Sequence, residues 1–429
     1  MKDEGTGLQV YKFGGASVKD AAAILNLCRI VRDFGPSGPL LIVVSAMGKT
    51  TNALEEIFDL AYHGRDYASQ LTVLENFHYA VVDGIRGTPD DEQGVPIVTR
   101  GNESLANLLQ ELRERLAAIN TGDYDQQYDQ IVSYGEMLSS LIVAWVLHSQ
   151  WLDCRPLIRT DRVWREGYVN WQITERVLTQ TLPDYLSKGL IVTQGFIGST
   201  ASGATTTLGR EGSDYSAAIF AYCLRAECVT IWKDVPGLLN ADPKIFPNPV
   251  LYSEISYQET IEMAFYGASV IHPKTLKPLA DRHIPLRVRS FLDPSAPGTL
   301  IHDCQHPPLV PAFIRKAGQC LLSFESKDFA FISEENLEVI FGALAQARLK
   351  INLMQNSAIS FSVCTDYTQI RVQRLLGLLQ GQFRVQYNSD LTLFTIKHYD
   401  AASIEQLTAG RELLLEQRTR STFQFLVRE

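Results

Sequence analysis

The chain has 429 residues, which at roughly 150 residues per domain predicts two or three domains with cores large enough to fold without disulfides or metals. Hydrophobic residues make up 45% and charged residues 20%, and these values exclude a disordered or collagen-like chain. The 39 basic and 48 acidic side chains give a net charge of −9, which argues against nucleic acid as the main partner.

Neither the N-terminus nor the cysteine pattern suggests an exported or membrane protein. The first residues contain no apolar segment of the kind found in signal peptides. Apolar runs such as Leu40–Val44 and Leu141–Leu147 are much shorter than the about 20 residues that span a bilayer. The seven cysteines include no C-x-x-C pair, which predicts free thiols in a reducing cytoplasm and no metal site.

The first 300 residues alternate short β-branched runs with helical stretches. Leu8–Phe13 is predicted to be a strand, Val18–Phe34 a helix, and Leu40–Val44 a central strand that is apolar on both faces. This alternation of strands and helices predicts an α/β fold with a largely parallel sheet. The further predicted elements are helices at Thr51–Tyr62 and Gln130–Leu152, strands at Leu157–Thr160 and Gly189–Phe196, a helix at Ser213–Leu224, a strand at Cys228–Trp232, helices at Ser256–Tyr266 and Pro273–Arg282, and a strand at Leu286–Ser290.

A proline-rich stretch, His306–Pro311, marks a linker, after which the order of elements changes. We therefore expect an α/β domain at residues 1–305 and a small α+β region at residues 306–429. The predicted elements of this region are strands at Gly318–Phe324, Ile351–Gln355, Ala358–Val363 and Thr392–Lys397, helices at Glu334–Arg348 and Gln369–Leu379, and one more helix and one strand within Ala402–Glu429.

The segment Tyr11–Val18 takes a strand through two glycines into a helix, with Lys12 at the end of the strand. Glycines let a backbone approach a ligand closely, and a helix N-terminus attracts anions, so the segment could cradle a phosphate. A tight turn with a solvated lysine is the alternative. Ser45 ends the next strand, at the edge where open α/β sheets bind their ligands.

Thr205–Tyr215 combines hydroxyls, glycines, an arginine and an aspartate between a strand and a helix. Arg210 could clamp a carboxylate or phosphate with two hydrogen bonds. Ser213 or Asp214 could instead simply cap the helix. Glu136 falls in a predicted first helical turn, where a carboxylate is favourable to the helix dipole whether or not it binds a substrate.

Two further segments remain ambiguous. Lys233–Gly237 and Asn240–Lys244 follow a buried strand and could either hold a nucleotide or form ordinary turns. Gly48-Lys-Thr50 is no P-loop, because Val43 stands where that loop needs a glycine. His272 precedes a proline and is more typical of a structural histidine than of a catalytic one.

Together these segments resemble the aspartate kinases of the amino-acid kinase superfamily, over about residues 8–302, and the tail resembles the regulatory ACT domains of that family. The matching segments, in the order of the family, are KFGGAS at 12–17, SAMGKTTN at 45–52, SYGE at 133–136, TQGFIGS at 193–199, TTTLGREGSDYSAA at 205–218, WKDVPGLLNADPK at 232–244 and YGASVIHPKTLKP at 266–278.

The resemblance implies that ATP phosphorylates the side-chain carboxylate of L-aspartate to 4-phospho-L-aspartate, which is the first step towards lysine, threonine and methionine. It implies Mg²⁺ carried mainly by the phosphates, and a homodimer or higher homo-oligomer formed through the ACT-like units. No homoserine dehydrogenase domain follows the tail, so we expect a monofunctional enzyme.

The same resemblance assigns roles to individual residues. Lys12 is expected to stabilise the transferred phosphoryl group, and Asp214 to orient Lys12 or the substrate amine. Glu136 is expected to bind the α-ammonium of aspartate and Arg210 its α-carboxylate, with Ser45, Thr51 and Ser213 nearby. The expected ATP ligands are Gly14, Gly15, Lys233, Asp234, Leu239, Asp242, Lys244, Ser269 and Val270.

The chain departs from the common pattern of the family at four positions. Ala16 replaces a threonine, and Glu211 replaces a glycine and adds a negative charge near the anions. Lys233 replaces a threonine and could add a phosphate contact. Ser269 replaces a lysine, so one nucleotide contact is missing, and Lys274 or Lys233 could supply it instead.

The tail also departs from the family, which usually carries two ACT units. Residues 318–390 can make one full unit, and the second is predicted to lack its final helix and strand. Leu349–Leu353 resembles the lysine-sensing segment of the family, but Asn352 stands where an acid is expected and Lys350 adds a repelling charge. We therefore expect no inhibition by lysine.

Two alternatives remain open at this stage. The first is a kinase of another acidic amino acid, such as an acetylglutamate kinase, although the long tail argues against it. The second is a regulatory homologue with weak catalysis, which the changes at Ala16, Glu211 and Ser269 make conceivable.

Overall fold

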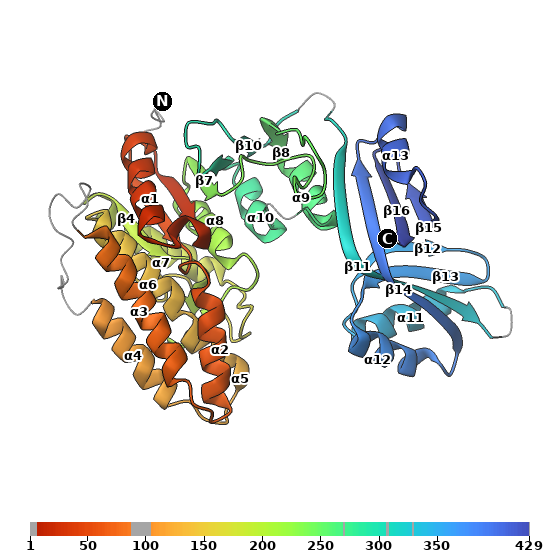
Figure 1. The fold of residues 1–429 in the computed structure, drawn as a ribbon, viewed down its shortest axis with the longest axis horizontal. Helices are drawn as coiled ribbons and strands as arrows, with labels where there is room; N and C mark the ends of the chain where they lie inside the picture. Colours follow the sequence, from red (N-terminus) through yellow and green to blue (C-terminus); the bar gives the residue numbers. More distant parts are fainter. Residues whose placement is uncertain (1–6, 87–103, 269–270, 306–308, 328–329, 429) are drawn as a thin grey trace. The chain divides into compact units, whose positions relative to one another are not determined.

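The computed structural model describes residues 7–86, 104–268, 271–305, 309–327 and 330–428 (Figure 1). These residues divide into two compact units. The first takes its residues from Met1–Leu238, Leu251–Ile261 and Val270–Gln305, and the second from Leu239–Val250, Glu262–Ser269 and His306–Glu429. Because two short segments before residue 306 group with the second unit, a domain made of residues 1–305 alone stays a prediction.

The first unit is built on an eight-stranded sheet in which the pairing of β9 with β10 is antiparallel and the other pairings are parallel. The predicted α/β class with a largely parallel sheet is therefore confirmed. In the order in which they pair, the strands are β3 (Gln150–Leu152), β4 (Ile191–Gln194), β2 (Leu40–Val44), β1 (Gln9–Phe13), β7 (Cys228–Lys233), β9 (Leu286–Ser290), β10 (Thr299–His302) and β8 (Glu254–Ser256).

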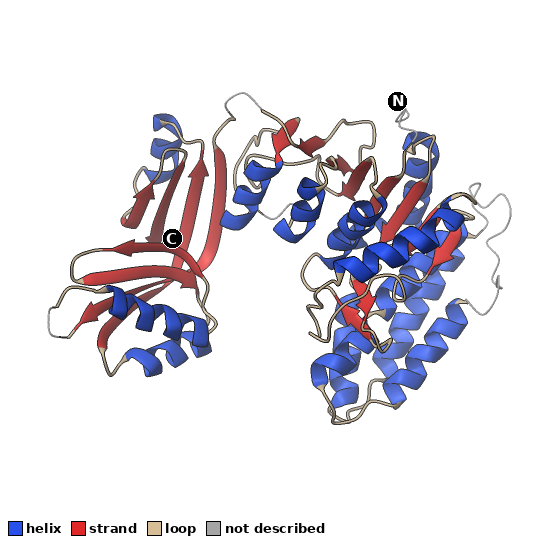
Figure 2. Ribbon diagram, turned by 180° about the vertical axis from the view of Figure 1, so that it is seen from behind, coloured by secondary structure: helices blue, strands red, loops and turns tan. Residues whose placement is uncertain are grey.

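Every residue of β1 and β2 is buried, because helices cover both faces of the sheet (Figure 2). Apolar side chains on both sides of a strand suit this position, since neither face meets water. The helices of this part of the chain are α1 (Ala21–Phe34), α2 (Thr50–Tyr62), α3 (Ala68–Ile85), α4 (Leu105–Ala117), α5 (Tyr124–Val132), α6 (Tyr134–Val146), α7 (Trp171–Leu186), α8 (Gly212–Leu224), α9 (Tyr257–Tyr266) and α10 (Pro273–Asp281).

The register of the parallel strands brings their carboxyl ends to one edge of the sheet. Phe13, the last residue of β1, pairs with Val44 on one side and Trp232 on the other, and Val44 pairs with Gln194. The segments that follow β1, β2, β4 and β7 therefore meet at this edge, which is where open α/β sheets bind ligands.

Among its described residues from 309 onwards, the second unit contains a fully antiparallel six-stranded sheet and three helices, as expected for an ACT-like α+β region. Two strands of 15 residues, β11 and β14, run side by side through both halves of this sheet. In pairing order the strands are β12 (Ile351–Asn356), β13 (Ser360–Asp366), β11 (Ala312–Ser326), β14 (Phe383–Lys397), β16 (Thr422–Arg428) and β15 (Leu413–Arg418), and the helices are α11 (Glu334–Gln346), α12 (Gln369–Leu379) and α13 (Ala401–Thr408).

Three predicted elements are wrong in detail. The helix predicted at Gln130–Leu152 is two helices, α5 and α6, followed by strand β3. The strand predicted at Leu157–Thr160 makes only isolated bridges, from Arg159 to Ser199 and from Thr160 to Val169. The tail after Ala401 has one helix and two strands, because β15 and β16 form a hairpin on the edge of the second sheet.

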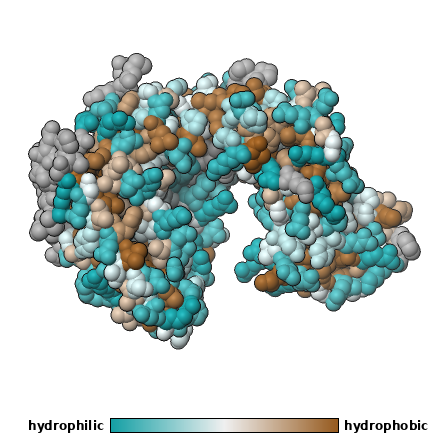
Figure 3. Space-filling model, in the orientation of Figure 1, coloured by the Kyte–Doolittle hydropathy of each residue, from teal (hydrophilic) through white to brown (hydrophobic). Residues whose placement is uncertain are grey.

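Among the described residues, no helix combines the length and the apolar composition that crossing a bilayer requires. On the face seen in Figure 3, hydrophobic side chains are scattered among hydrophilic ones. The seven cysteines all lie in the described residues and form no disulfide.

Candidate active site

The turn after β1 places Lys12 near a glycine, Gly15, at which two turns of the backbone approach each other closely. β1 ends at Phe13, and a short 3₁₀ helix, η1 (Gly15–Val18), begins two residues later. A Cβ on Gly15 would lie only 2.8 Å from the carbonyl oxygen of Ala46, so a side chain there would push apart the turns that follow β1 and β2. The glycine keeps these turns in contact and leaves Lys12 at the edge of the sheet.

Lys12, Asp214 and Lys233 form a charge cluster in which Lys12 and Asp214 are buried and Lys233 is partly buried. The Nζ of Lys12 lies 2.5 Å from Oδ1 of Asp214, and the Nζ of Lys233 lies 3.2 Å from Oδ2. Burial alone would raise the pKa of Asp214, but the two ammonium groups outweigh it and hold that pKa below its ordinary value. Asp214 is therefore ionised at neutral pH, and the cluster keeps a net positive charge.

Glu136 lies in the first turn of α6 and is buried. Its Oε1 accepts a hydrogen bond of 3.2 Å from the backbone N–H of Ala46, and its Oε2 has no hydrogen-bond partner within the described chain. Burial raises the pKa of Glu136 to about 8, although the Ala46 hydrogen bond and the charge of Lys12 oppose the rise. A buried carboxyl oxygen without a partner indicates a binding site for a donor that is not part of the chain.

The loop before α8 carries the arginine predicted to bind a carboxylate. Arg210 is exposed, and Glu211, which follows it, adopts the left-handed conformation with a φ of 53°. A glycine would adopt this conformation without strain, whereas Glu211 adopts it at a cost. The Oε2 of Glu211 is buried and has no hydrogen-bond partner in the part of the chain described here.

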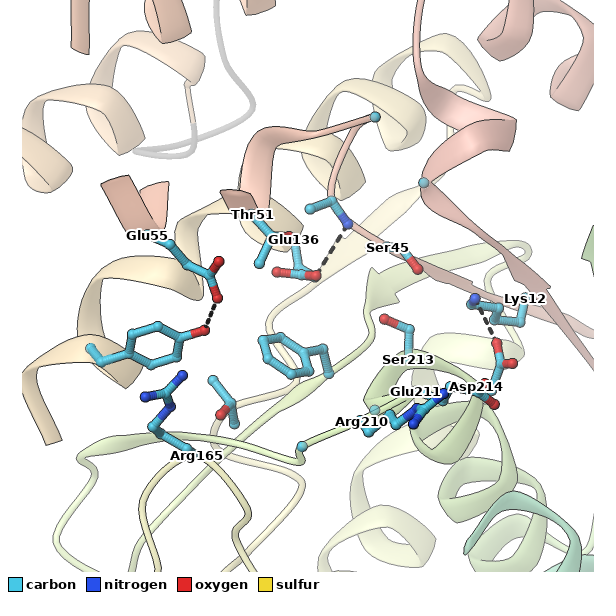
Figure 4. Close-up of a pocket in the computed structure, with 18 of the residues that line it drawn as sticks. Lys12, Ser45, Thr51, Glu55, Glu136, Arg165, Arg210, Glu211, Ser213 and Asp214 are labelled. Carbon is cyan, nitrogen blue, oxygen red and sulfur yellow. Dashed lines mark hydrogen bonds and ion pairs between the residues drawn. The ribbon is translucent and has the colours of Figure 1, made fainter. Parts of the chain in front are cut away.

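These side chains line one pocket of about 570 Å³, a size typical of small-molecule sites. In the view of Figure 4, Lys12 and Asp214 lie at one end, Glu55 and Arg165 at the other, and Glu136 between them. The predicted site residues that line the pocket are Lys12, Gly15, Ser45, Thr51, Glu136, Arg210, Ser213, Asp214 and Lys233.

Other predicted residues lie elsewhere. Gly14 is next to Lys12, since a Cβ on it would be 3.6 Å from the lysine Nζ, and Asp234 is exposed after β7; neither is part of the pocket lining. Three predicted ATP ligands, Leu239, Asp242 and Lys244, belong to the second unit. Ser269 and Val270 fall outside the described residues, so their roles, like the other assigned roles, stay predictions.

The sequence did not point to the far end of the pocket. There the hydroxyl of Tyr128 donates a hydrogen bond to Glu55, and the guanidinium of Arg165 lies 4.0 Å from the centre of the Tyr128 ring. Buried Asp129 holds this corner together, because it accepts hydrogen bonds from the backbone N–H groups of Arg165 and Thr207. Phe196, which also lines the pocket and lies two residues after β4, has a positive φ of 67°.

Comparisons with known proteins agree with this architecture. The model of the amino acid kinase family matches residues 7–290. Lysine-sensitive aspartokinase 3 of Escherichia coli (strain K12) is 34% identical over 401 residues, which cover 90% of this chain and 86% of the relative.

Two solved structures of E. coli aspartokinase III are also similar. The structure in complex with aspartate and ADP (R-state) has a TM-score of 0.81 at 30% identity, and the one in complex with lysine and aspartate (T-state) has a TM-score of 0.78 at 30% identity. Each match covers 98% of this chain and 96% of the other. The chain therefore belongs to the amino acid kinase family and, within it, to the aspartokinases.

Proposed function

We propose that this chain transfers the γ-phosphoryl group of ATP to the side-chain carboxylate of L-aspartate, which yields 4-phospho-L-aspartate and ADP. The observation that carries the proposal is that Lys12, Glu136 and Arg210 line a single pocket. An amino acid and a phosphoryl group can therefore be held against each other there. The aspartate and ADP bound by the similar E. coli enzyme support the same pair of ligands for this chain.

The chemistry needs no general base. The side-chain carboxyl of aspartate has a pKa of about 3.9, so it is already an ionised nucleophile at neutral pH. One of its oxygens attacks the γ-phosphorus, and the bond from that phosphorus to the β-phosphate oxygen breaks. Because both reactants are anions, the protein accelerates the reaction by positioning them and by neutralising charge.

The two charged groups on the α-carbon of aspartate find complementary groups in the pocket. The partnerless Oε2 of Glu136 is the acceptor for the α-ammonium, and the exposed guanidinium of Arg210 is the donor for the α-carboxylate. With the α-ammonium and the α-carboxylate bound, the side-chain carboxylate is free to extend towards Lys12. Ser45, Thr51 and Ser213 supply hydroxyls along the same lining.

Stabilisation of the transferred phosphoryl group depends on the cluster of Lys12, Asp214 and Lys233. Asp214 holds the Lys12 ammonium at 2.5 Å and the Lys233 ammonium at 3.2 Å, so both charges are in place before the substrates bind. Such a preorganised cluster stabilises the charge that spreads over the phosphoryl oxygens in the transition state.

The lining leaves few carboxylates for a metal ion. Asp214 is paired with two lysines, Glu55 accepts the Tyr128 hydroxyl, and Glu136 is largely protonated at neutral pH because its pKa is about 8. This donor set fits Mg²⁺ held mainly by the phosphates. Bound there, Mg²⁺ would neutralise phosphate charge.

The affinity for aspartate is expected to depend on pH through Glu136. Its pKa of about 8 means that the carboxylate needed for the α-ammonium appears as the pH rises through 8. The KM for aspartate should therefore fall roughly five- to tenfold between pH 7 and pH 8.5, as the ionised fraction of such a group grows. Steady-state kinetics on the wild type and on Glu136→Gln would measure this. An equally steep pH dependence in Glu136→Gln would contradict the assignment.

Glu211 is expected to reduce both stability and activity. Glu211→Gly removes left-handed strain and should stabilise the fold by about 1 kcal/mol, and it also removes a negative charge from an anion site. The kcat/KM for ATP should rise. Glu211→Ala separates the two effects, because it removes the charge and keeps the strain. A higher Mg²⁺ requirement in both variants would show instead that this carboxylate holds the metal.

One assay decides between the function and its alternatives. ADP release is coupled to a dehydrogenase in the presence of L-aspartate, of N-acetyl-L-glutamate or of neither acid, and hydroxylamine traps the acyl phosphate. Turnover with aspartate alone is expected. Turnover with acetylglutamate alone would select the first alternative, and ligand-induced thermal shifts without turnover would select the weakly catalytic homologue.

Lysine is not expected to inhibit this chain. The side chain of Asn352 is held within its own unit, where its Oδ1 accepts a hydrogen bond of 2.9 Å from Lys316 and its Nδ2 donates one of 2.7 Å to Gln319. Lys350 adds positive charge nearby. The assay should give the same rate with and without millimolar lysine, and E. coli aspartokinase III serves as the control. Inhibition of both enzymes would contradict the prediction.

We also propose that the second unit joins two copies of the chain. β12 lies at one edge of the six-stranded sheet and exposes Met354, while α11 and α12 expose Phe341 and Ile370. An edge strand offers unpaired backbone groups to a second copy. Light scattering at micromolar concentration should give at least twice the mass of the chain.

A further inference from the structure

A second group of ligand-type side chains lies at the far edge of the eight-stranded sheet. Glu254 begins β8, His302 ends β10, and Cys304 follows two residues later. The strands pair in parallel with Glu254 opposite Leu300, so Glu254 and His302 extend from the same face. One potential ligand atom from each of the three side chains lies within 4.8 Å of the other two.

The cluster is open to solvent on one side. The side chain of His302 is 30% exposed, that of Glu254 is 50% exposed, and Cys304 is partly buried. The Nε2 of His302 and the Oε1 of Glu254 are within hydrogen-bonding distance. An ion could therefore enter from water, and the imidazole and carboxylate already face each other.

The donor set selects a particular class of metal. A thiolate, an imidazole and a carboxylate are the ligands of Zn²⁺ in proteins, whereas Mg²⁺ and Ca²⁺ take oxygen ligands. A thiolate and a carboxylate together would also balance the charge of a divalent ion. Ligands at about 2.0–2.3 Å from a tetrahedral zinc lie roughly 3.3–3.7 Å from one another. Side chains whose ligand atoms already lie within 4.8 Å need only small rotations to reach that arrangement.

We infer that Glu254, His302 and Cys304 form a binding site for Zn²⁺ or a similar divalent transition metal, with water as the fourth ligand. The ion would tie β8, the edge strand, to β10 and to the chain that leaves β10. An edge strand of three residues has few hydrogen bonds of its own, so a metal bond across it would stabilise this end of the sheet.

This site is separate from the kinase pocket. In the sheet, β8 is separated from β1, which carries Lys12, by β7, β9 and β10, or about 19 Å at roughly 4.8 Å per strand. The spacing of the three residues does not predict the site, since His302 and Glu254 are 48 residues apart and the sequence lacks a standard zinc-ligand spacing. The inference does not depend on the proposed kinase activity.

Titration of the untagged, full-length protein with Co²⁺ after treatment with a chelator tests the proposal. The wild type is expected to bind about one equivalent with a thiolate-to-cobalt charge-transfer absorption, and Zn²⁺ should displace the cobalt. Cys304→Ser should abolish the absorption, and Glu254→Gln should weaken Co²⁺ binding tenfold or more. Cys28→Ser, which changes the other partly buried cysteine, should behave like the wild type.

Two further measurements guard against misfolding as an explanation. Cys304→Ser should keep its far-ultraviolet circular dichroism and its kinase rate, because Cys304 is remote from the pocket. Zn²⁺ should raise the unfolding temperature of the wild type and of Cys28→Ser, and leave that of Cys304→Ser unchanged. If the wild type fails to bind either metal at micromolar concentration, or if Cys304→Ser keeps the cobalt absorption, the cluster is only a histidine–glutamate pair beside a thiol and the proposal is overturned.

Discussion

Replacing Lys12 with alanine is expected to lower kcat about 10²–10³-fold, the typical loss when one preorganised donor to a transition-state oxyanion is removed. Lys12 lies on β1, is almost fully buried and contacts Asp214 at 2.5 Å. The variant should still fold, because Lys233 continues to pair with Asp214 and no buried carboxylate is left alone. The KM for ATP should change much less than kcat, since the lysine acts mainly on the phosphoryl group in transfer.

The matched control for this change is Lys19→Ala. Lys19 follows the same glycine turn, but its side chain is exposed and is not part of the pocket lining. Kinetics at saturating aspartate and varied ATP would measure both variants. If Lys12→Ala retained the wild-type kcat, the role assigned to this lysine would be wrong.

Replacing Arg210 with alanine should raise the KM for aspartate about 10–100-fold, the loss expected for hydrogen bonds to a charged group. The KM for ATP should stay nearly constant, because the guanidinium is assigned to the α-carboxylate of the amino acid. Arg210→Lys should recover only part of the affinity, since an ammonium cannot make the paired hydrogen bonds of a guanidinium.

Arg162→Ala is the control for Arg210, because Arg162 is also exposed and is not part of the pocket lining. Aspartate saturation curves and, separately, ATP saturation curves distinguish the outcomes. A parallel loss of affinity for both substrates would mean that Arg210 shapes the whole pocket rather than binding one carboxylate.

The sequence predicted the five central strands of the first sheet, but it missed the outer strands β3, β10 and β8 and several helices. Leu40–Val44 is recognisable as β2 because its five apolar residues are buried on both faces. α7 was missed since it contains Pro183 and several β-branched residues, which have weak helix preference. α3 was missed because Glu75 and His78 lie on its buried side and interrupt the apolar stripe. α4 is a different case, because its leucines recur at the spacing of an amphipathic helix and do predict one.

The site was predictable where a motif and a strand end coincide. Lys12, Arg210 and Asp214 each lie within two residues of a glycine at the edge of the sheet, and they line the pocket. Tyr128 and Arg165 belong to no recognisable motif. They reach the pocket through a long-range contact, since Asp129 on α5 holds the backbone of Arg165 and Thr207 together. Such tertiary contacts leave no local trace in the sequence.

β11 and β14 have a consequence for how the tail can respond to any ligand. Each is a single 15-residue strand, and their pairing continues from Ala312–Lys397 to Ser326–Phe383, interrupted only by register shifts near Gln319. Both strands continue from one half into the other, so a ligand that changes the twist at one end strains the same pair of backbones at the other. The two halves of the six-stranded sheet should thus deform together, and proteolysis should not release either half intact.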